Sequence, residues 1–290
     1  MSLRLKFNLI IGTTFAAGFG ISAYVINDLL QNQAQEEILH TAGIMMESAL
    51  SIRNYTVSEI KPLLAEKLHE EFLPQSVPAY AATTNIQGLR KTYPEYSYKE
   101  ATLNPTNPMS RATDWETSVV NHFRNDTTAK ELTGTREAAT GKSFYLARPI
   151  QVKSGACLDC HGTVEHAPPA MLAKYGNANG FGWNLNEVVG AQIVSVPMNI
   201  ALRRADQAFQ AFLLATGAIF LVALLLLNLL LHIFVIKPAV SMARIAEDVS
   251  LGKADAPEFE PKGNDELASL GHSFNRMRRS LDNAMQMLDE

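Results

Sequence analysis

The residues with the clearest chemistry are Cys157, Cys160 and His161, which stand in the pentapeptide Cys157-Leu158-Asp159-Cys160-His161. Their spacing is the C-x-x-C-H pattern of covalent c-type haem attachment. Two thiols can add to the two vinyl groups of one haem, and the adjacent histidine then offers a neutral imidazole as an axial ligand of the iron. The sequence therefore predicts one covalently attached haem c, with His161 as its proximal ligand.

Both cysteines of the chain lie in this motif, which limits the other interpretations. A disulfide scaffold usually has more cysteines at wider spacings, and a structural zinc site would need two further Cys or His ligands at paired spacing. A thioredoxin-like dithiol is the remaining alternative, because it also uses C-x-x-C. That motif does not require a histidine, so we favour haem attachment.

Two long uncharged apolar runs decide the class of the protein. Residues 7–27 and residues 209–236 are each long enough to cross a hydrocarbon core of about 30 Å as a helix. A cleaved secretory signal is the rival interpretation of the first run, but the run is longer than a typical signal core and no clear Ala-x-Ala site follows it. A net charge of −4 and a pI near 6.0 give no sign of a nucleic-acid partner.

The charges that flank the two runs predict their orientation. Arg4 and Lys6 precede the first run, and Lys237 and Arg244 follow the second, so the positive-inside rule places both outer ends in the cytoplasm. We therefore expect a two-pass protein of a bacterial inner membrane with its middle segment in the periplasm. The expected organisation is a cytoplasmic N-terminus at 1–6, membrane helices at 7–27 and 209–236, an extracytoplasmic domain at 28–208 and a cytoplasmic region at 237–290.

Periodicity and turn residues predict an α+β fold for the extracytoplasmic domain. A helix over residues 28–57 has one narrow apolar stripe, which indicates a packing seam against another helix, with Met45 or Met46 as an alternative haem ligand. The other expected elements are helices at 62–72 and 79–91, a helix capped by Thr113 or Asp114, and strands at 143–152, 181–183 and 188–196.

This domain resembles the PAS-like, single-haem c-type sensor domains of bacterial membrane receptors. The resemblance covers residues 39–198 and rests on five short segments, namely 103–108 (L-N-P-T-N-P), 115–116 (W-E), 157–162 (C-L-D-C-H-G), 180–183 (G-F-G-W) and 189–191 (V-G-A). It implies a PAS-like haem-binding fold, thioethers at Cys157 and Cys160, and proximal ligation by His161.

The resemblance also implies a second axial ligand that varies within the family. Some members use a cysteine on the N-terminal helix, but this chain has no third cysteine, and the matching stretch at 51–58 offers Arg53 and Tyr55. The distal ligand therefore stays open among Tyr55, Arg53, Met46, Met109, His122 and His166. A vacant or weakly held position would favour gas binding, whereas a strong Met or His ligand would favour redox change alone.

Beyond the second apolar run, two short amphipathic helices joined by a connector resemble a HAMP linker, the parallel four-helix bundle that relays receptor signals. Pro238, Gly252 and Glu266 stand where that family places its marker residues. Neither helix can bury its apolar stripe alone, so we expect an all-α HAMP domain at 237–290 that forms a homodimer together with the membrane helices. A plain coiled coil at the membrane exit, the alternative, also predicts a homodimer.

These features favour a membrane sensor rather than an enzyme. A change in haem redox state, or the binding of a small gas such as NO, CO or oxygen, would bias two packings of the HAMP bundle. The chain ends at Glu290 without a recognisable output domain, so we expect a separate cytoplasmic signalling protein as partner. The alternative functions are a membrane-anchored monohaem c-type cytochrome that exchanges electrons with a donor, and a thiol oxidoreductase.

Overall fold

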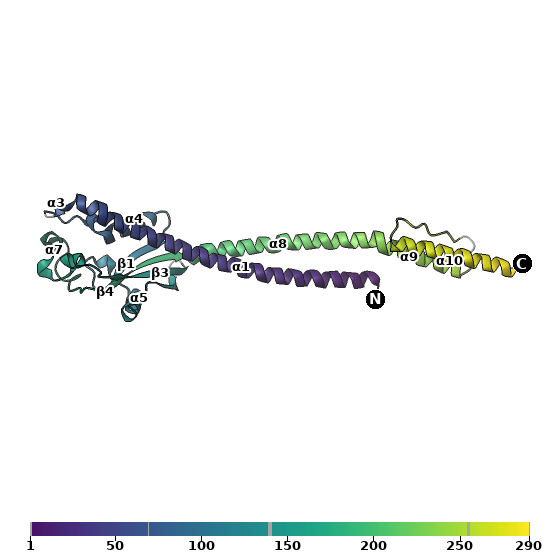
Figure 1. The fold of residues 1–290 in the computed structure, drawn as a ribbon, viewed down its shortest axis with the longest axis horizontal. Coiled ribbons are helices and arrows are strands. Elements are labelled where there is room, and N and C mark those ends of the chain that lie inside the picture. Colours follow the sequence, from purple (N-terminus) through teal and green to yellow (C-terminus); the bar gives the residue numbers. More distant parts are fainter. Residues whose placement is uncertain (1, 69, 139–140, 254–255, 290) are drawn as a thin grey trace. The chain divides into compact units, whose positions relative to one another are not determined.

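The computed structural model describes residues 2–68, 70–138, 141–253 and 256–289. The chain divides into two compact units, each of which is described by itself. One unit is Asn27–Ala208, and the other consists of Met1–Ile26 and Phe209–Glu290. Figure 1 labels most of the longer elements of both units.

The first unit is built on one antiparallel sheet with strand order β1-β4-β3-β2. The strands are β1 (Ser97–Thr102), β2 (Leu132–Ala138), β3 (Gly141–Gln151) and β4 (Val188–Pro197). Every residue of β4 is buried, since this strand pairs on both sides and is covered on both faces. The sheet confirms the α+β prediction for this part of the chain.

One face of the sheet packs against α1 (Leu3–Tyr55), α4 (Pro78–Leu89) and the start of α8 (Met198–Leu231). Val194 and Val196 of β4 lie in this cluster. The predicted stripe of α1 lies here, with Ile38, Ala42, Met45 and Ala49 buried and Ile52 partly buried, and the neighbouring Met46 is buried as well. The stripe is thus a packing seam, and its partners are the sheet, α4 and α8 of the same chain.

The other face packs against α5 (Asp114–Asn125), which lies on the opposite side of the sheet from α4 in Figure 1. Ala191 and Ile193 of β4 lie in this second cluster. The N-terminus of α5 has a capping box, in which the Thr113 N–H donates to the Glu116 carboxylate at 2.8 Å and the Thr113 side chain accepts from the backbone of Glu116. This confirms the predicted cap at Thr113.

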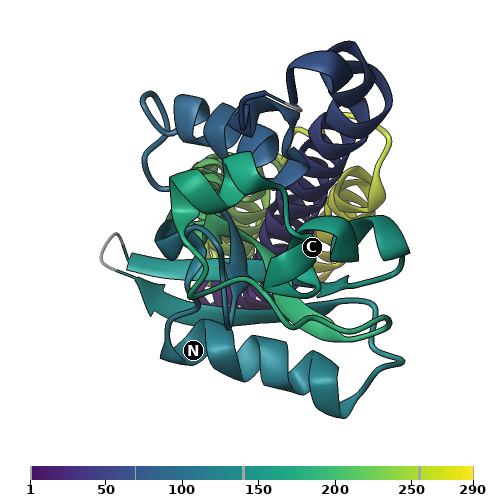
Figure 2. The same cartoon turned by 90° about the vertical axis from the view of Figure 1, so that its left-hand side faces the viewer.

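The remaining elements are short and lie mostly at one end of the unit, the end that faces the viewer in Figure 2. They include α2 (Lys61–Leu63), α3 (Ala65–Leu68), α6 (Leu158–His161) and α7 (Pro169–Tyr175). The 3₁₀ turns are Pro74–Ser76, Pro108–Ser110, Gly155–Cys157 and Val164–His166.

Several sequence predictions for this unit were wrong. Strands β1 and β2 were missed, because their polar side chains mask the alternation, and the helix expected at 62–72 is broken into α2 and α3. Residues 181–183 are not a strand, since the Gly182 and Trp183 N–H groups bond to the carbonyls of Gly162 and His161 rather than to a ladder. The irregular loop expected after the haem motif contains α7.

Both long helices pass through a π turn that ends at the isoleucine of an Ile-Lys-Pro sequence. These turns are Thr56–Ile60, which precedes Pro62, and His232–Ile236, which precedes Pro238. A proline inside a helix lacks an N–H and crowds the carbonyl four residues earlier, so the helix widens locally. Each proline therefore marks the position at which a long helix changes geometry.

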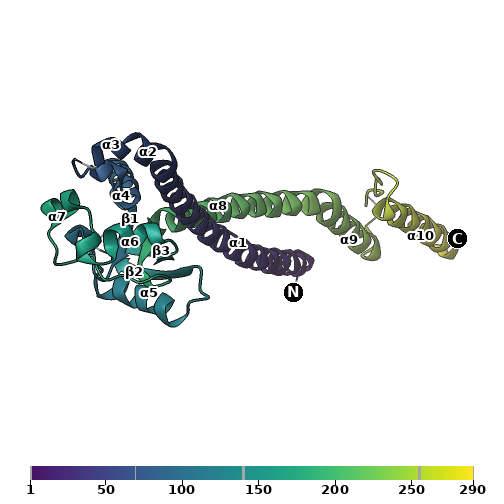
Figure 3. The same cartoon turned by 60° about the vertical axis from the view of Figure 1, so that its left-hand side comes forward.

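The second unit holds the two apolar segments and two amphipathic helices. By length and composition, α1 and α8 could each cross a membrane, with mean hydropathies of 1.8 and 2.9 in their most apolar stretches. Phe15 and Phe220 stack with ring centroids 5.0 Å apart. Beyond α8 lie α9 (Lys237–Ser250) and α10 (Glu266–Asp289), which Figure 3 shows with the connector between them.

The connector is fastened to α10 by specific contacts. The Asn275 side chain donates to the Phe259 carbonyl at 2.7 Å and accepts from the Phe259 N–H at 3.3 Å, while Asp265 caps the helix through the Ala268 N–H at 2.8 Å. Along α10, Leu270, Met277 and Leu281 of the predicted heptad stripe remain exposed. The side chain of Leu288, the last position of the stripe, lies outside the described residues.

A buried polar network ties the end of α1 to the sheet. Arg53 donates two hydrogen bonds to the Glu100 carboxylate, which also accepts from the Tyr98 hydroxyl at 2.8 Å. Gln192 donates to the same hydroxyl at 3.2 Å. The Glu100 side chain is only 6% exposed, so its charge depends on Arg53 for compensation.

Replacing Arg53 with Met is expected to lower the free energy of unfolding by about 3 kcal/mol, the lower end of the range for breaking a buried ion pair, because Arg53 is partly exposed. Arg204→Met is the matched control, since Arg204 forms an exposed pair with Glu37 whose loss should cost less than about 1 kcal/mol. Chemical denaturation followed by circular dichroism measures both losses. Equal losses would contradict the role given to Arg53.

Candidate functional site

The C-x-x-C-H motif lies on two short turns that follow β3. The Ser154 hydroxyl accepts the Ala156 N–H at 3.2 Å and starts the 3₁₀ turn, which leads directly into α6. Both thiols are unpaired and partly exposed. Because Cys157 precedes α6 and Cys160 lies inside it, the short helix determines the separation of the two sulfur atoms.

The imidazole of His161, the last residue of α6, is fixed by a hydrogen bond at one ring nitrogen and by stacking on one face. Its Nδ1 lies 2.7 Å from the Gly180 carbonyl oxygen, so Nδ1 carries the proton in this hydrogen bond and Nε2 is the nitrogen left for a metal. The ring stacks on Trp183, with centroids 4.0 Å apart and an interplanar angle of 14°. Burial lowers the pKa of His161, although the bond to Gly180 opposes the shift, and the ring is therefore neutral at pH 7.

The loop at 180–183 that supports His161 is pinned to the motif by its backbone. The Gly182 N–H donates to the Gly162 carbonyl at 2.7 Å, and the Trp183 N–H donates to the His161 carbonyl at 3.1 Å. Gly180 has a positive φ of 87°, and a Cβ at this position would lie 2.7 Å from the backbone nitrogen of Thr106. Only glycine allows this backbone conformation together with such a close approach.

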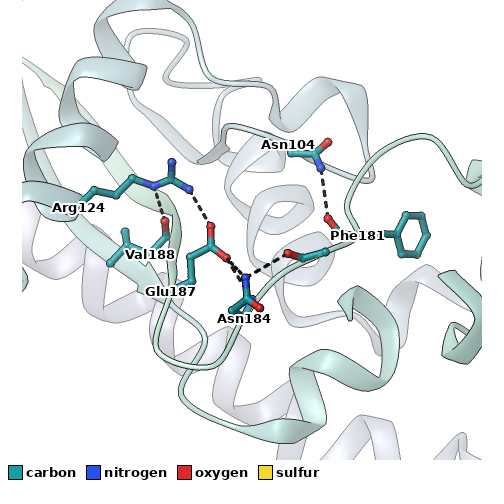
Figure 4. Close-up of polar contacts among 7 residues, drawn as sticks. Asn104, Arg124, Phe181, Asn184, Glu187 and Val188 are labelled. Atoms are coloured by element: carbon teal, nitrogen blue, oxygen red, sulfur yellow. Dashed lines mark hydrogen bonds and ion pairs between the residues drawn. The ribbon is translucent and has the colours of Figure 1, made fainter. Parts of the chain in front are cut away.

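A second set of polar contacts fastens the far end of this loop (Figure 4). Glu187 accepts from the Asn184 N–H at 3.1 Å and from Arg124 of α5 at 3.0 Å. Arg124 also donates through Nε to the Val188 carbonyl at 2.8 Å, where β4 begins. The loop that carries the His161 contacts is therefore held at both ends before it enters the central strand.

The structure separates most of the predicted distal ligands from one another. Met46 is buried in the α1 seam, Arg53 is bound to Glu100, and Met109 is 78% exposed on a 3₁₀ turn. His122 lies on α5, on the opposite side of the sheet from α1. His166 bonds through Nδ1 to the Thr163 hydroxyl at 2.8 Å.

Tyr55 is the last residue of α1 and is 58% exposed. The chain continues from Tyr55 through the π turn into α2. Figure 3 labels α2, α3, α6 and α7 at the same end of the unit. This placement selects none of the six distal candidates, and the distal ligand stays a prediction.

The residues of the motif fit a covalently bound haem. Two unpaired thiols precede a neutral histidine whose Nδ1 is engaged, which is the donor set that such a group requires. They fit a dithiol oxidoreductase less well. Burial raises the pKa of the Cys160 thiol, with Lys61 acting in the opposite direction, whereas reactive thiols of that class have lowered values.

Sequence reasoning named Cys157, Cys160 and His161 but missed the residues that support the histidine. These are Gly180, Trp183 and Asn104, whose side chain contacts the loop at 180–183. The segments that hold them, L-N-P-T-N-P and G-F-G-W, were identified only as family resemblance. Their glycines and turn residues were a signal of tight loops, but nothing in the sequence paired one loop with the other.

Gly180→Ala is expected to destabilise the protein more than Gly182→Ala. Both positions have a positive φ, 87° and 76°, which costs an alanine about 1–2 kcal/mol. A Cβ at position 182 would meet no heavy atom within 4 Å, whereas one at 180 would clash with Thr106. We expect a further loss of at least about 1 kcal/mol for Gly180→Ala, measured by thermal unfolding. Equal destabilisation would exclude the close approach of the two loops.

Comparisons with known proteins agree with this division of the chain. A family model described as Tll0287-like matches residues 31–197, and a HAMP domain model matches residues 230–283. No curated protein matches the chain. A solved structure, the crystal structure of the cyanobacterial heme-protein Tll0287, is 17% identical with a TM-score of 0.42, and the match covers 56% of this chain and 95% of that chain.

The identity and TM-score of that structure are low, whereas the family model matches more than half of the chain. The HAMP match covers the amphipathic helices and confirms the HAMP domain predicted from Pro238, Gly252 and Glu266. Because the matched residues 31–197 include the sheet, the C-x-x-C-H motif and the loop that holds His161, the chain belongs to the Tll0287-like family, with a HAMP domain following.

Proposed function

We propose that this chain is a membrane receptor that carries one haem c and relays the state of the haem to the cytoplasm through its HAMP domain. Cys157 and Cys160 would form the two thioether bonds, and His161 would bind the iron through Nε2. The receptor would span a bacterial inner membrane twice, with its PAS-like haem domain in the periplasm. It would act as a sensor and not as an enzyme.

One observation carries this proposal, the hydrogen bond between His161 and Gly180. A histidine that ligates a metal almost always donates its other ring N–H to a fixed acceptor, which sets the tautomer and the ring orientation. His161 has that arrangement at 2.7 Å, directly after two unpaired cysteines at haem-attachment spacing. When bound, the haem would supply an iron that changes charge by one electron or binds a diatomic gas.

The positions of three distal candidates favour a vacant or weakly held distal position. Met46 is buried in the α1 seam, Arg53 is bound to Glu100, and His122 lies on α5 on the far face of the sheet. Tyr55, Met109 and the Nε2 of His166 remain as candidates for a weak distal ligand. A small gas such as NO, CO or oxygen is therefore the favoured signal, and a change in redox state is the other. Either signal would alter the strength of the bond between the iron and His161.

One hydrogen bond and a continuous stretch of backbone connect His161 with the second apolar helix. The loop at 180–183 holds the imidazole, Glu187 fastens its end, and β4 begins at Val188. β4 ends at Pro197 and α8 begins at Met198, so no flexible loop separates them. A displacement of the loop would therefore pass through a fully buried strand into α8.

The output would be the packing of a dimeric HAMP bundle. In the isolated chain, Leu270, Met277 and Leu281 of α10 are exposed, and a second copy would bury them. A parallel bundle with two packings is the bistable element that such a relay requires. We propose a homodimer through HAMP and the membrane helices, which signals to a cytoplasmic protein.

Replacing both cysteines, Cys157→Ala and Cys160→Ala, is expected to abolish covalent haem. The purified wild-type chain should keep its haem in acid-acetone and give a c-type absorption band in alkaline pyridine. His166→Gln, which changes an exposed histidine of the same loop, is the control and should keep the band. Absence of covalent haem from the wild-type chain would overturn the proposed function.

Cysteine crosslinking at Leu270→Cys is expected to differ between the oxidised and reduced receptor, or between the gas-free and NO-bound forms. Leu270 lies on the exposed stripe of α10, so its distance to the partner copy should depend on the packing of the bundle. His272→Cys, on the outward face of the same helix, is the control and should crosslink weakly in every state. Identical crosslinking at position 270 in all states, with haem fully loaded, would refute signalling and favour a simple electron carrier.

A further inference from the structure

Asn104 clamps the backbone on both sides of the carbonyl that holds His161. Its Oδ1 accepts the Gly180 N–H at 3.2 Å, and its Nδ2 donates to the Phe181 carbonyl at 3.5 Å. Between these two groups lies the Gly180 carbonyl, which accepts from His161 at 2.7 Å. One amide side chain therefore spans the peptide whose oxygen orients the imidazole. Figure 4 shows the contact between Asn104 and Phe181.

The position of Asn104 is itself set by the sheet. β1 ends at Thr102, the Leu103 N–H donates to the Val189 carbonyl at 3.3 Å, and Asn104 is the next residue. The segment then passes so close to Gly180 that a Cβ there would lie 2.7 Å from the Thr106 nitrogen. Asn104 therefore links the paired strands β1 and β4 to the loop at 180–183, which contacts His161.

This clamp has a chemical consequence for a metal bound at Nε2. A strong hydrogen bond from Nδ1–H to a fixed carbonyl increases electron density on the ring and makes Nε2 a better donor. A better donor stabilises ferric over ferrous iron and so lowers the reduction potential. Loss of the clamp would let the Gly180 carbonyl turn away, weaken the bond and raise the potential.

We propose that Asn104 is a positioning residue that sets the reduction potential of the haem by fixing the Gly180 carbonyl against His161. The inference rests on the proposed function, because it requires haem ligated by His161. Asn104 touches neither the iron nor its ligand directly. It acts through one peptide group.

The test compares the midpoint potential of the full chain with those of Asn104→Leu and Asn104→Ala. Both variants are neutral and remove both hydrogen bonds; Leu keeps the volume, and Ala avoids any clash. Asn107→Ala is the matched control, because Asn107 lies in the same segment and caps its own turn through the Met109 N–H at 3.0 Å. Haem content is measured on each sample by the pyridine absorption band.

We expect both Asn104 variants to load haem and to shift the redox equilibrium toward ferrous iron by about tenfold, or about 59 mV for one electron. Their ferrous iron–histidine vibration should move to lower frequency, and Asn107→Ala should match the wild type in both measurements. Normal haem content with an unchanged midpoint potential in both Asn104 variants would overturn this inference but leave the proposed function intact.

Two further outcomes also decide the matter. Loss of haem from both Asn104 variants, with Asn107→Ala normal, would assign Asn104 to folding of the loop and overturn the tuning role. Absence of haem from the wild-type chain would overturn the proposed function, and the inference with it. The haem measurement distinguishes these failures.

Discussion

The hydrogen bond between His161 Nδ1 and the Gly180 carbonyl is the interaction on which the geometry of the haem motif depends. It can form only if the loop at 180–183 approaches α6 closely, which requires glycine at position 180 and backbone bonds from Gly182 and Trp183 to the motif. Since a buried imidazole in this position stays neutral, the same constraint prepares Nε2 to bind iron. The sheet, the capped α5 and the loop contacts serve to hold these two backbone segments together.

The position of β4 connects this constraint to the rest of the chain. β4 contributes to both apolar clusters, is buried along its whole length, and continues into α8 without a loop. The buried Arg53–Glu100 pair attaches the end of α1 to the same sheet. Both long helices are therefore bonded to, or continuous with, strands of this sheet, α1 with β1 and α8 with β4.

The sequence predicted features that depend on local pattern. The C-x-x-C-H motif, the apolar runs, the Thr113 cap, the α1 seam and the HAMP helices all follow from residue types at short spacing. Features that depend on distant pairing were missed. The sequence of β1 appears too polar for a buried strand, because it contains Glu100, whose charge is compensated by Arg53, 47 residues away. Residues 181–183 have the residue types of a strand, but the N–H groups of Gly182 and Trp183 bond to carbonyls of Gly162 and His161 instead of to another strand. The link from Asn104 to Gly180 spans 76 residues, and no local pattern reveals it.

The resonance Raman spectrum of the ferrous full chain, with natural and with ¹⁵N-labelled histidine, tests the central claim most directly. If His161 binds the iron and the distal position is vacant or weakly held, the spectrum will contain an iron–histidine stretching band of five-coordinate haem that shifts on labelling. A six-coordinate ferrous spectrum without a labelled band would contradict the account, because a strong distal ligand would then oppose His161. A band that does not respond to the label would exclude histidine as the proximal ligand.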